Sequence, residues 1–274
     1  MRAYLIYSMG KTGSTSLYQM VKRRGDIAIH THGLYENHTY VSNLHKELDV
    51  LITDDLQYVI HQFGITEIKM VCSFRNPIDR RISGFVHDLN KDIISEEPIR
   101  FKYPPGKNVI SHYLRHKELA PYELLRDLFL KHYIEYRVDE VKRYDYPGMF
   151  DFVPFFFEKQ FVKELSTLLD LSINFTDLFF KGSIQGNSSF FGVPTEYLFF
   201  KFENISSLAP MISSFLDFPT GTKLLHERNS NDFSYFSATD PKVLKERLKK
   251  ECRNSVRVNQ FMNEPLIRSM FYTF

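Results

Sequence analysis

The sequence predicts an α/β fold in which helices flank a central parallel sheet. Short apolar runs typical of buried strands alternate with segments of helical periodicity along the first third of the chain. The first run, Ala3 to Tyr7, leads through a loop rich in glycine, serine and threonine into a helical pattern that begins near Thr15. Because ligands bind beyond the carboxyl ends of the strands in such sheets, residues that follow strands are the first candidates for a site.

Two more strands and two more helices are expected before residue 93. Ile27 to Thr31 and Glu67 to Phe74 are apolar runs typical of strands. Between them, Leu44 to Phe63 has helical spacing and is closed by Gly64, a residue common at helix ends. Pro77 suits the first turn of a helix. The apolar residues after it are spaced for a buried stripe: Ile78, Ile82, Phe85 and Leu89.

The pattern changes after residue 93. Prolines and a glycine interrupt the periodicity between about 93 and 120, which indicates an irregular excursion over the surface. Beyond it we expect helices over 121–143, 158–169 and 240–253 and a buried strand over 196–202, with Glu203 as a cap after the strand. The length of 274 residues and the 43% of hydrophobic residues suit one large domain over 1–274.

The composition argues against several classes of protein. The 35 basic and 33 acidic residues are too balanced for a protein that wraps nucleic acid, so any anion site must be local. Two cysteines, Cys72 and Cys252, suggest neither a disulfide framework nor a zinc cluster. The chain has no run that fits a signal peptide and no transmembrane segment. We therefore expect a cytoplasmic protein.

The strongest chemical signal is the loop from Gly10 to Ser16, between the first strand and the first helix. The backbone N–H groups of such a loop, its hydroxyls and its lysine make a concave anion site in front of a helix N-terminus. A Walker loop would place the lysine directly after its last glycine. Here Lys11 precedes Gly13, and no glycine lies four or five residues before Gly10, so the Walker motif is absent.

The run from Lys11 to Thr15 resembles the 5′-phosphosulfate loop of the sulfotransferases that use 3′-phosphoadenosine 5′-phosphosulfate (PAPS). The run from Val71 to Phe85 resembles their 3′-phosphate element, in which an arginine ends a strand and a serine follows eight positions later. A guanidinium and a hydroxyl both suit phosphate oxygens. The resemblance implies a P-loop-like three-layer fold, PAPS as co-substrate, no metal, and a donor site made of Lys11, Thr12, Gly13, Ser14, Thr15, Ser16, Arg75 and Ser83.

A third candidate is His30-Thr31-His32, at the end of an expected strand, where alternation puts both imidazoles on one face. This order resembles the His-x-His of uronyl and heparan-type glycosaminoglycan sulfotransferases, which implies His32 as the base and Lys11 as the group that stabilises the leaving phosphate. A structural or metal-ligand role for the two histidines is the alternative. His30, His61 or a carboxylate also stay open as the base.

These resemblances imply transfer of a sulfuryl group from PAPS to a hydroxyl of a carbohydrate acceptor. The tail from Phe261 to Phe274 resembles that of bacterial capsular polysaccharide synthesis proteins, which points to a capsular or surface polysaccharide or its precursor. His226 to Asn231 stands where the family folds a loop over the nucleotide, and the excursion at about 93–120 is a candidate acceptor site. The alternatives are a P-loop-like ATP-dependent kinase and a non-catalytic nucleotide-binding protein.

Overall fold

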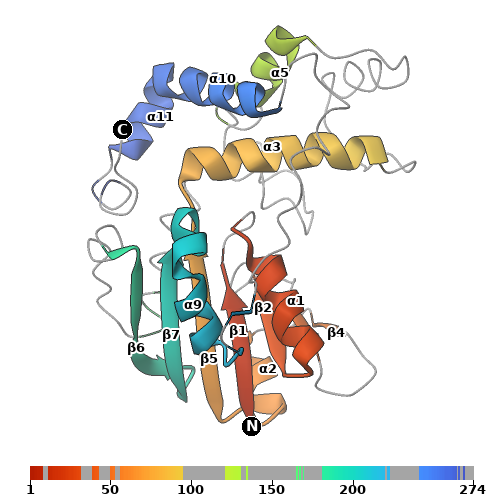
Figure 1. The fold of residues 1–274 in the computed structure, drawn as a ribbon, viewed down its shortest axis with the longest axis vertical. Helices are drawn as coiled ribbons and strands as arrows, with labels where there is room; N and C mark the ends of the chain where they lie inside the picture. Colours follow the sequence, from red (N-terminus) through yellow and green to blue (C-terminus); the bar gives the residue numbers. More distant parts are fainter. Residues whose placement is uncertain are drawn as a thin grey trace.

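The computed structural model shows a sheet flanked by helices, with further helices beyond one edge of the sheet (Figure 1). It describes residues 1–8, 12–31, 39–42, 50–52, 56–94, 121–130, 134, 165, 167, 169, 181–219, 221–222, 241–263, 265 and 268. Both Lys11 and His32 therefore lie outside the described residues, as do residues 95–120, most of the expected excursion.

Seven strands form one sheet in the order β4-β3-β2-β1-β5-β7-β6. The strands are β1 (Arg2–Tyr7), β2 (Ala28–Thr31), β3 (Thr39–Ser42), β4 (Val50–Ile52), β5 (Glu67–Phe74), β6 (Ser183–Phe190) and β7 (Val193–Lys201). The central strands β2, β1, β5 and β7 pair in parallel. The outer strands β3, β4 and β6 pair antiparallel, so the expected parallel sheet forms the centre of a mixed one.

The helices form a layer on each face of the sheet, which confirms the expected three-layer α/β fold. Within the described ranges they are α1 (Ser14–Arg24), α2 (Leu56–Gln62), α3 (Pro77–Ile94), α5 (Tyr122–Phe129), α9 (Ile205–Phe215), α10 (Pro241–Asn254) and α11 (Val256–Met262). A 3-10 turn, η3 (Phe202–Asn204), joins β7 to α9. None of these helices has the length and the hydrophobicity that crossing a membrane requires.

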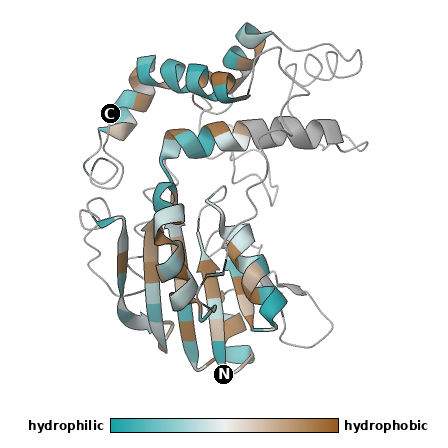
Figure 2. Ribbon diagram, viewed as in Figure 1, coloured by the Kyte–Doolittle hydropathy of each residue, from teal (hydrophilic) through white to brown (hydrophobic). Residues whose placement is uncertain are grey.

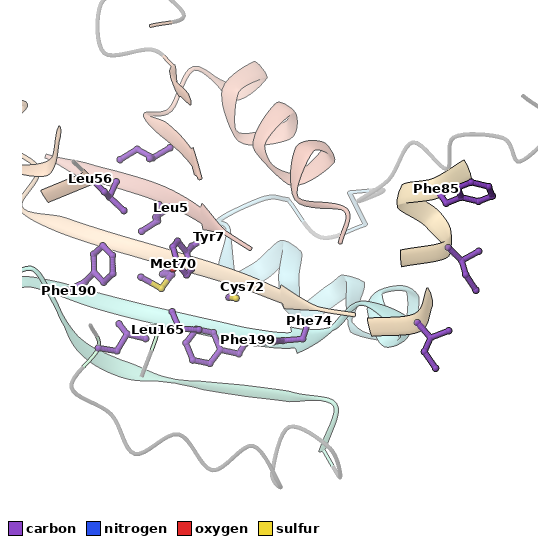
Figure 3. Packing of buried hydrophobic residues seen from close by; sticks show 14 of the residues in the cluster. Leu5, Tyr7, Leu56, Met70, Cys72, Phe74, Phe85, Leu165, Phe190 and Phe199 are labelled. Carbon is purple, nitrogen blue, oxygen red and sulfur yellow. The ribbon is translucent and has the colours of Figure 1, made fainter. Parts of the chain in front are cut away.

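Alternate side chains of β1 enter two separate hydrophobic clusters. Leu5 and Tyr7 belong to the cluster that includes the apolar face of α2, and Figure 3 shows them beside Met70 and Cys72 of β5. Tyr4 and Ile6 belong to the cluster filled by α1 and α9. The period of two along the strand therefore supplies both faces of the sheet with buried side chains, and hydrophobic colour gathers on the central strands in Figure 2.

Helix α10 is highly charged but has one buried stripe. Leu244, Leu248 and Cys252 are spaced by one helical turn and join the same cluster as α2 and α3. Burial raises the pKa of the Cys252 thiol to about 12, which keeps it protonated. The stripe therefore fixes which faces of α10 point toward α3 and which toward solvent.

The helix predicted over 44–63 is wrong in part. Val50–Ile52 is strand β4, paired antiparallel with β3, and the described helix α2 covers only Leu56–Gln62. An apolar run this short satisfies a strand as well as a helical period, and pairing with β3 decides between the two. Residues 93 and 94, placed in the irregular excursion, are the last residues of α3.

Chain order places a switch point between β1 and β5. From β1 the chain passes through α1 to β2 on one side, whereas β5 pairs with β1 on the other side. Helices α1 and α3, which follow β1 and β5, therefore both begin at the carboxyl edge of the sheet. Open α/β sheets bind ligands at this position, and both predicted phosphate motifs lie there.

Candidate anion-binding site at the carboxyl edge of the sheet

Gly13 has a backbone conformation that favours glycine. Its φ of +78° is left-handed, and it immediately precedes α1 as the N-cap residue. A Cβ atom at this position would lie 2.6 Å from Cε2 of Phe202, so the space beside the glycine is also filled. Any side chain here would strain the backbone and displace the Phe202 ring.

Hydroxyl groups fasten the loop to the sheet. Thr12 donates through Oγ1 to Ser8 Oγ at 3.1 Å, and Ser73 of β5 donates to the Thr12 carbonyl at 2.9 Å. All three side chains are buried. The hydroxyl of Thr12, which was predicted to bind the donor, is therefore used in a buried hydrogen bond to Ser8. Ser73, which holds the Thr12 carbonyl, was not among the predicted site residues.

The first turn of α1 presents the other predicted loop residues. Ser14 is buried, Thr15 is exposed and Ser16 is partly exposed. The Gly13 carbonyl accepts from the N–H of Ser16 at 3.1 Å. Because the first N–H groups of a helix lack intrahelical acceptors, the start of α1 is suited to bind an anion in front of the loop.

His30 is buried against the loop. Its Nε2 lies 3.0 Å from Ser14 Oγ, and its ring stacks on Tyr18 with centroids 5.4 Å apart. Only 5% of its surface is exposed. His30, one of the histidines considered as the catalytic base, therefore contacts Ser14, the first residue of α1. His61 is exposed at the end of α2, which leads into the start of β5 at the opposite edge of the sheet.

Arg75 follows the last residue of β5 and shares the Phe202 ring with Gly13. Its guanidinium carbon lies 5.0 Å from the ring centroid, a cation–π arrangement. Burial lowers the pKa of Arg75 and the charge of Arg80 adds to this, while the carboxylates of Asp79 and Glu203 act in the opposite direction. A guanidinium remains charged under such shifts, so Arg75 brings a desolvated positive charge to the carboxyl edge of the sheet.

Glu203 has a different role from the predicted cap. Its Oε1 accepts from the backbone N–H of Asn76 at 2.7 Å, so it ties η3 to the turn between β5 and α3. Asn76 in turn caps α3, since its Oδ1 accepts from the N–H of Ile78 at 3.0 Å. These contacts hold the backbone on the C-terminal side of Arg75 in place.

Ser83 lies on α3, two turns after the start of the helix, and is partly exposed. Asp79 lies one turn before it and therefore on the same face. Asp79 pairs with Lys249 of α10 at 2.8 Å. The predicted 3′-phosphate residues thus border a charged contact between α3 and α10, which no short motif reveals because residue 249 is far along the chain.

The structure brings the two predicted motifs to one edge of the sheet. Gly13, Ser14 and Arg75 surround the switch point, whereas the positions of Lys11 and His32 stay predictions. Within the described ranges, no group of three or more histidine, cysteine, aspartate or glutamate side chains is placed to hold a metal ion. Comparisons with protein-family models, with curated proteins and with solved structures found no match to this chain.

Proposed function

We propose that this chain is a sulfotransferase that transfers a sulfuryl group from PAPS to a hydroxyl of a carbohydrate acceptor. One observation carries the proposal: Gly13 and Arg75, the central residues of two motifs separated by some sixty positions, both contact the ring of Phe202. The resemblance of each motif is weak alone. Their meeting at the switch point of the sheet supports a common ligand site for both.

The donor would use this site through its two charged ends. The 5′-phosphosulfate would lie against the loop that ends at Gly13 and against the first turn of α1, where backbone N–H groups and the helix dipole favour anions. The 3′-phosphate would lie between Arg75 and Ser83. Binding energy from this remote phosphate would fix the orientation of the reacting sulfate.

In the proposed reaction the acceptor oxygen attacks sulfur in line with the bridging oxygen of the phosphosulfate. A new oxygen–sulfur bond forms, the bond from sulfur to the bridging oxygen breaks, and adenosine 3′,5′-bisphosphate leaves. His32 accepts the proton of the acceptor hydroxyl. Lys11 and the loop amides stabilise the negative charge that develops on the bridging oxygen. Chain connectivity supports both roles, since these residues adjoin Thr31, which ends β2, and Thr12, at the same carboxyl edge.

A carbohydrate acceptor and a cytoplasmic site of action belong to the same proposal. The carbohydrate acceptor is supported by the His-x-His order that ends in His32 and by the tail from Phe261 to Phe274. A capsular or surface polysaccharide, or its precursor, is the acceptor class to screen first.

Isothermal titration of the purified chain tests the donor site. We expect adenosine 3′,5′-bisphosphate to bind more tightly than adenosine 5′-monophosphate or ATP with magnesium, and Arg75→Ala to weaken it about ten- to a hundredfold. Arg23→Ala is the matched control, because Arg23 is an exposed arginine in the last turn of α1. Tightest binding of ATP with magnesium would favour a kinase and overturn the proposal.

Transfer itself is tested with labelled PAPS and a panel of polysaccharide and oligosaccharide acceptors. We expect label on at least one acceptor and its loss in His32→Ala, with bisphosphate binding retained in that variant. Bisphosphate binding without transfer to any acceptor, and with no effect of His32→Ala, would instead support a non-catalytic nucleotide-binding protein.

A further inference from the structure

Helices α3 and α10 run in opposite directions beyond the carboxyl ends of the strands (Figure 1). Helix α3 starts above the end of β5, and α10 ends on the same side of the molecule as that start before the chain turns into α11 (Figure 1). The ion pair between Asp79 and Lys249 fixes the register of the two helices, with the first turn of α3 opposite the second half of α10.

By helix periodicity, this register predicts that Lys245 lies on the stretch of α10 that is opposite Ser83. Moving one turn forward along α3 leads from Asp79 to Ser83, and moving one turn back along the antiparallel α10 leads from Lys249 to Lys245. Residues four apart share a helix face, so all four side chains border the same seam. The lysines and Ser83 are partly exposed, as expected for positions at the edge of a packed interface rather than inside it.

The charges of these residues agree with this placement. Burial lowers the pKa of Lys245, and the positive charges of Arg75 and Lys249 lower it further, while Asp79 acts in the opposite direction. Lys245 therefore lies within electrostatic reach of Arg75, although 170 positions separate them in the sequence. A phosphate bound among these cations would reduce their mutual repulsion.

We propose that Lys245 of α10 is a third cationic contact to the 3′-phosphate between Arg75 and Ser83, and that it sets the preference for a 3′,5′-bisphosphate over a 5′-monophosphate. This inference rests on the proposed donor site and extends it to the C-terminal part of the chain. Lys249 is a positioning residue in this arrangement, because its ion pair with Asp79 holds α10 at the level of the site.

The experiment compares Lys245→Gln with Lys250→Gln by titration with adenosine 3′,5′-bisphosphate and adenosine 5′-monophosphate. Glutamine keeps most of the methylene stem and removes the charge. Lys250 is a matched control, since it lies on the same helix but is exposed on another face. We expect Lys245→Gln to weaken the bisphosphate about ten- to a hundredfold and to leave the monophosphate unchanged. Lys245→Arg should restore the preference.

The outcomes separate the inference from the proposed function. If the wild type prefers the bisphosphate and Lys245→Gln behaves like Lys250→Gln, the role of Lys245 is overturned while the donor site stands. If the wild type shows no preference for the bisphosphate, the donor site and the role of Lys245 both fall. Thermal unfolding of each variant shows whether a loss of binding reflects a loss of fold. Unchanged binding of the monophosphate shows in addition that the 5′-phosphate end of the site is intact.

Discussion

The guanidinium of Arg75 lies over the ring of Phe202, with its carbon 5.0 Å from the ring centroid. The edge of that ring also fills the space beside Gly13. Stacking of a guanidinium on an aromatic face is favourable and restricts the arginine side chain before any ligand binds. Phe202 therefore couples the two motifs, so a change at the loop should be felt at Arg75.

Substitution of Gly13 tests this coupling. Gly13→Ala adds a Cβ in a left-handed conformation and in contact with Phe202, so we expect lower stability and weaker bisphosphate binding. Gly25→Ala is the control, because Gly25 ends the same helix with φ of +90° but has open space around it. The control should lose about 1–2 kcal/mol of stability from its backbone alone and bind normally. Equal binding by the two variants, measured by titration, would contradict the role of the ring.

The pair of His30 and Ser14 predicts a coupled effect on binding. In the tautomer that carries the proton on Nε2, His30 donates to Ser14 Oγ and leaves the Ser14 proton to donate to a bound 5′-phosphate. We expect His30→Leu and Ser14→Ala each to weaken bisphosphate binding and the double variant to lose little more, with a coupling energy of about 0.5–3 kcal/mol. The measurement is a double-mutant cycle by titration.

The same residues separate a positioning role from catalysis. His30→Gln places an amide nitrogen near the position of Nε2, so a positioning role for His30 predicts that binding and transfer largely survive in this variant. Complete loss of transfer with intact binding would instead make His30 the base. Additive losses in the double-mutant cycle would contradict the coupling.

The places of the two motifs in the fold could be predicted because each motif is recognised from neighbouring residues. A glycine-rich loop after an apolar run and an arginine at a strand end are read directly from neighbouring residues, and the structure places Gly13 and Arg75 at the same edge. The contribution of Phe202 was not predictable, because it depends on the sequence-distant pairing of β7 with β5, and an aromatic residue after a strand has no specific pattern.

The missed strands have a similar physical reason. β6 is rich in serine, with glutamine, glycine and asparagine, and its exposure alternates because it pairs only with β7 at the edge of the sheet. Such a strand lacks the apolar run that marks the central strands. Lys245 was missed because a lysine in a charged helix is usually solvated, and only the packing of Leu244 and Leu248 turns this face of α10 toward α3.

Asp217, at the opposite edge of the sheet, predicts a pH-dependent part of the stability. Its carboxylate accepts from Lys69 Nζ at 2.7 Å and from the Tyr4 hydroxyl at 2.8 Å, and the Lys69 side chain is only 9% exposed. Asp217→Asn keeps a residue that tolerates the φ of +57° but leaves Lys69 with only the more distant carboxylate of Glu196, at 3.9 Å. We expect a loss of about 1–3 kcal/mol in the free energy of unfolding at pH 7.

The sign of the pH dependence follows from the pKa of Asp217. Burial acts to raise this pKa, but the hydrogen bonds from Lys69 and Tyr4 outweigh it and the pKa is lowered from 3.8. The stabilisation is therefore complete well above pH 3.8 and is lost as the pH falls through the lower folded value. Urea unfolding of wild type and variant should differ most near neutral pH and converge in acid. Asp127→Asn, which breaks a pair with Arg126 in which both side chains are more exposed, is the control and should cost less.

The lowered pKa of Lys245 predicts how bisphosphate binding changes in alkaline solution. Burial lowers this pKa, the charges of Arg75 and Lys249 lower it further, and Asp79 opposes them. The ammonium form binds phosphate, so affinity should fall as the pH rises through a value below the 10.5 of an ordinary lysine. A bound phosphate favours the charged form, and binding should take up a proton in this pH range.

Titration in two buffers with different ionisation enthalpies measures that uptake. Lys245→Arg stays charged, so the part of the decline and of the proton uptake that belongs to Lys245 should be lost, and only a contribution from Lys11 should remain. The same alkaline decline and proton uptake in the arginine variant would assign the titration to another group and remove Lys245 from the phosphate site.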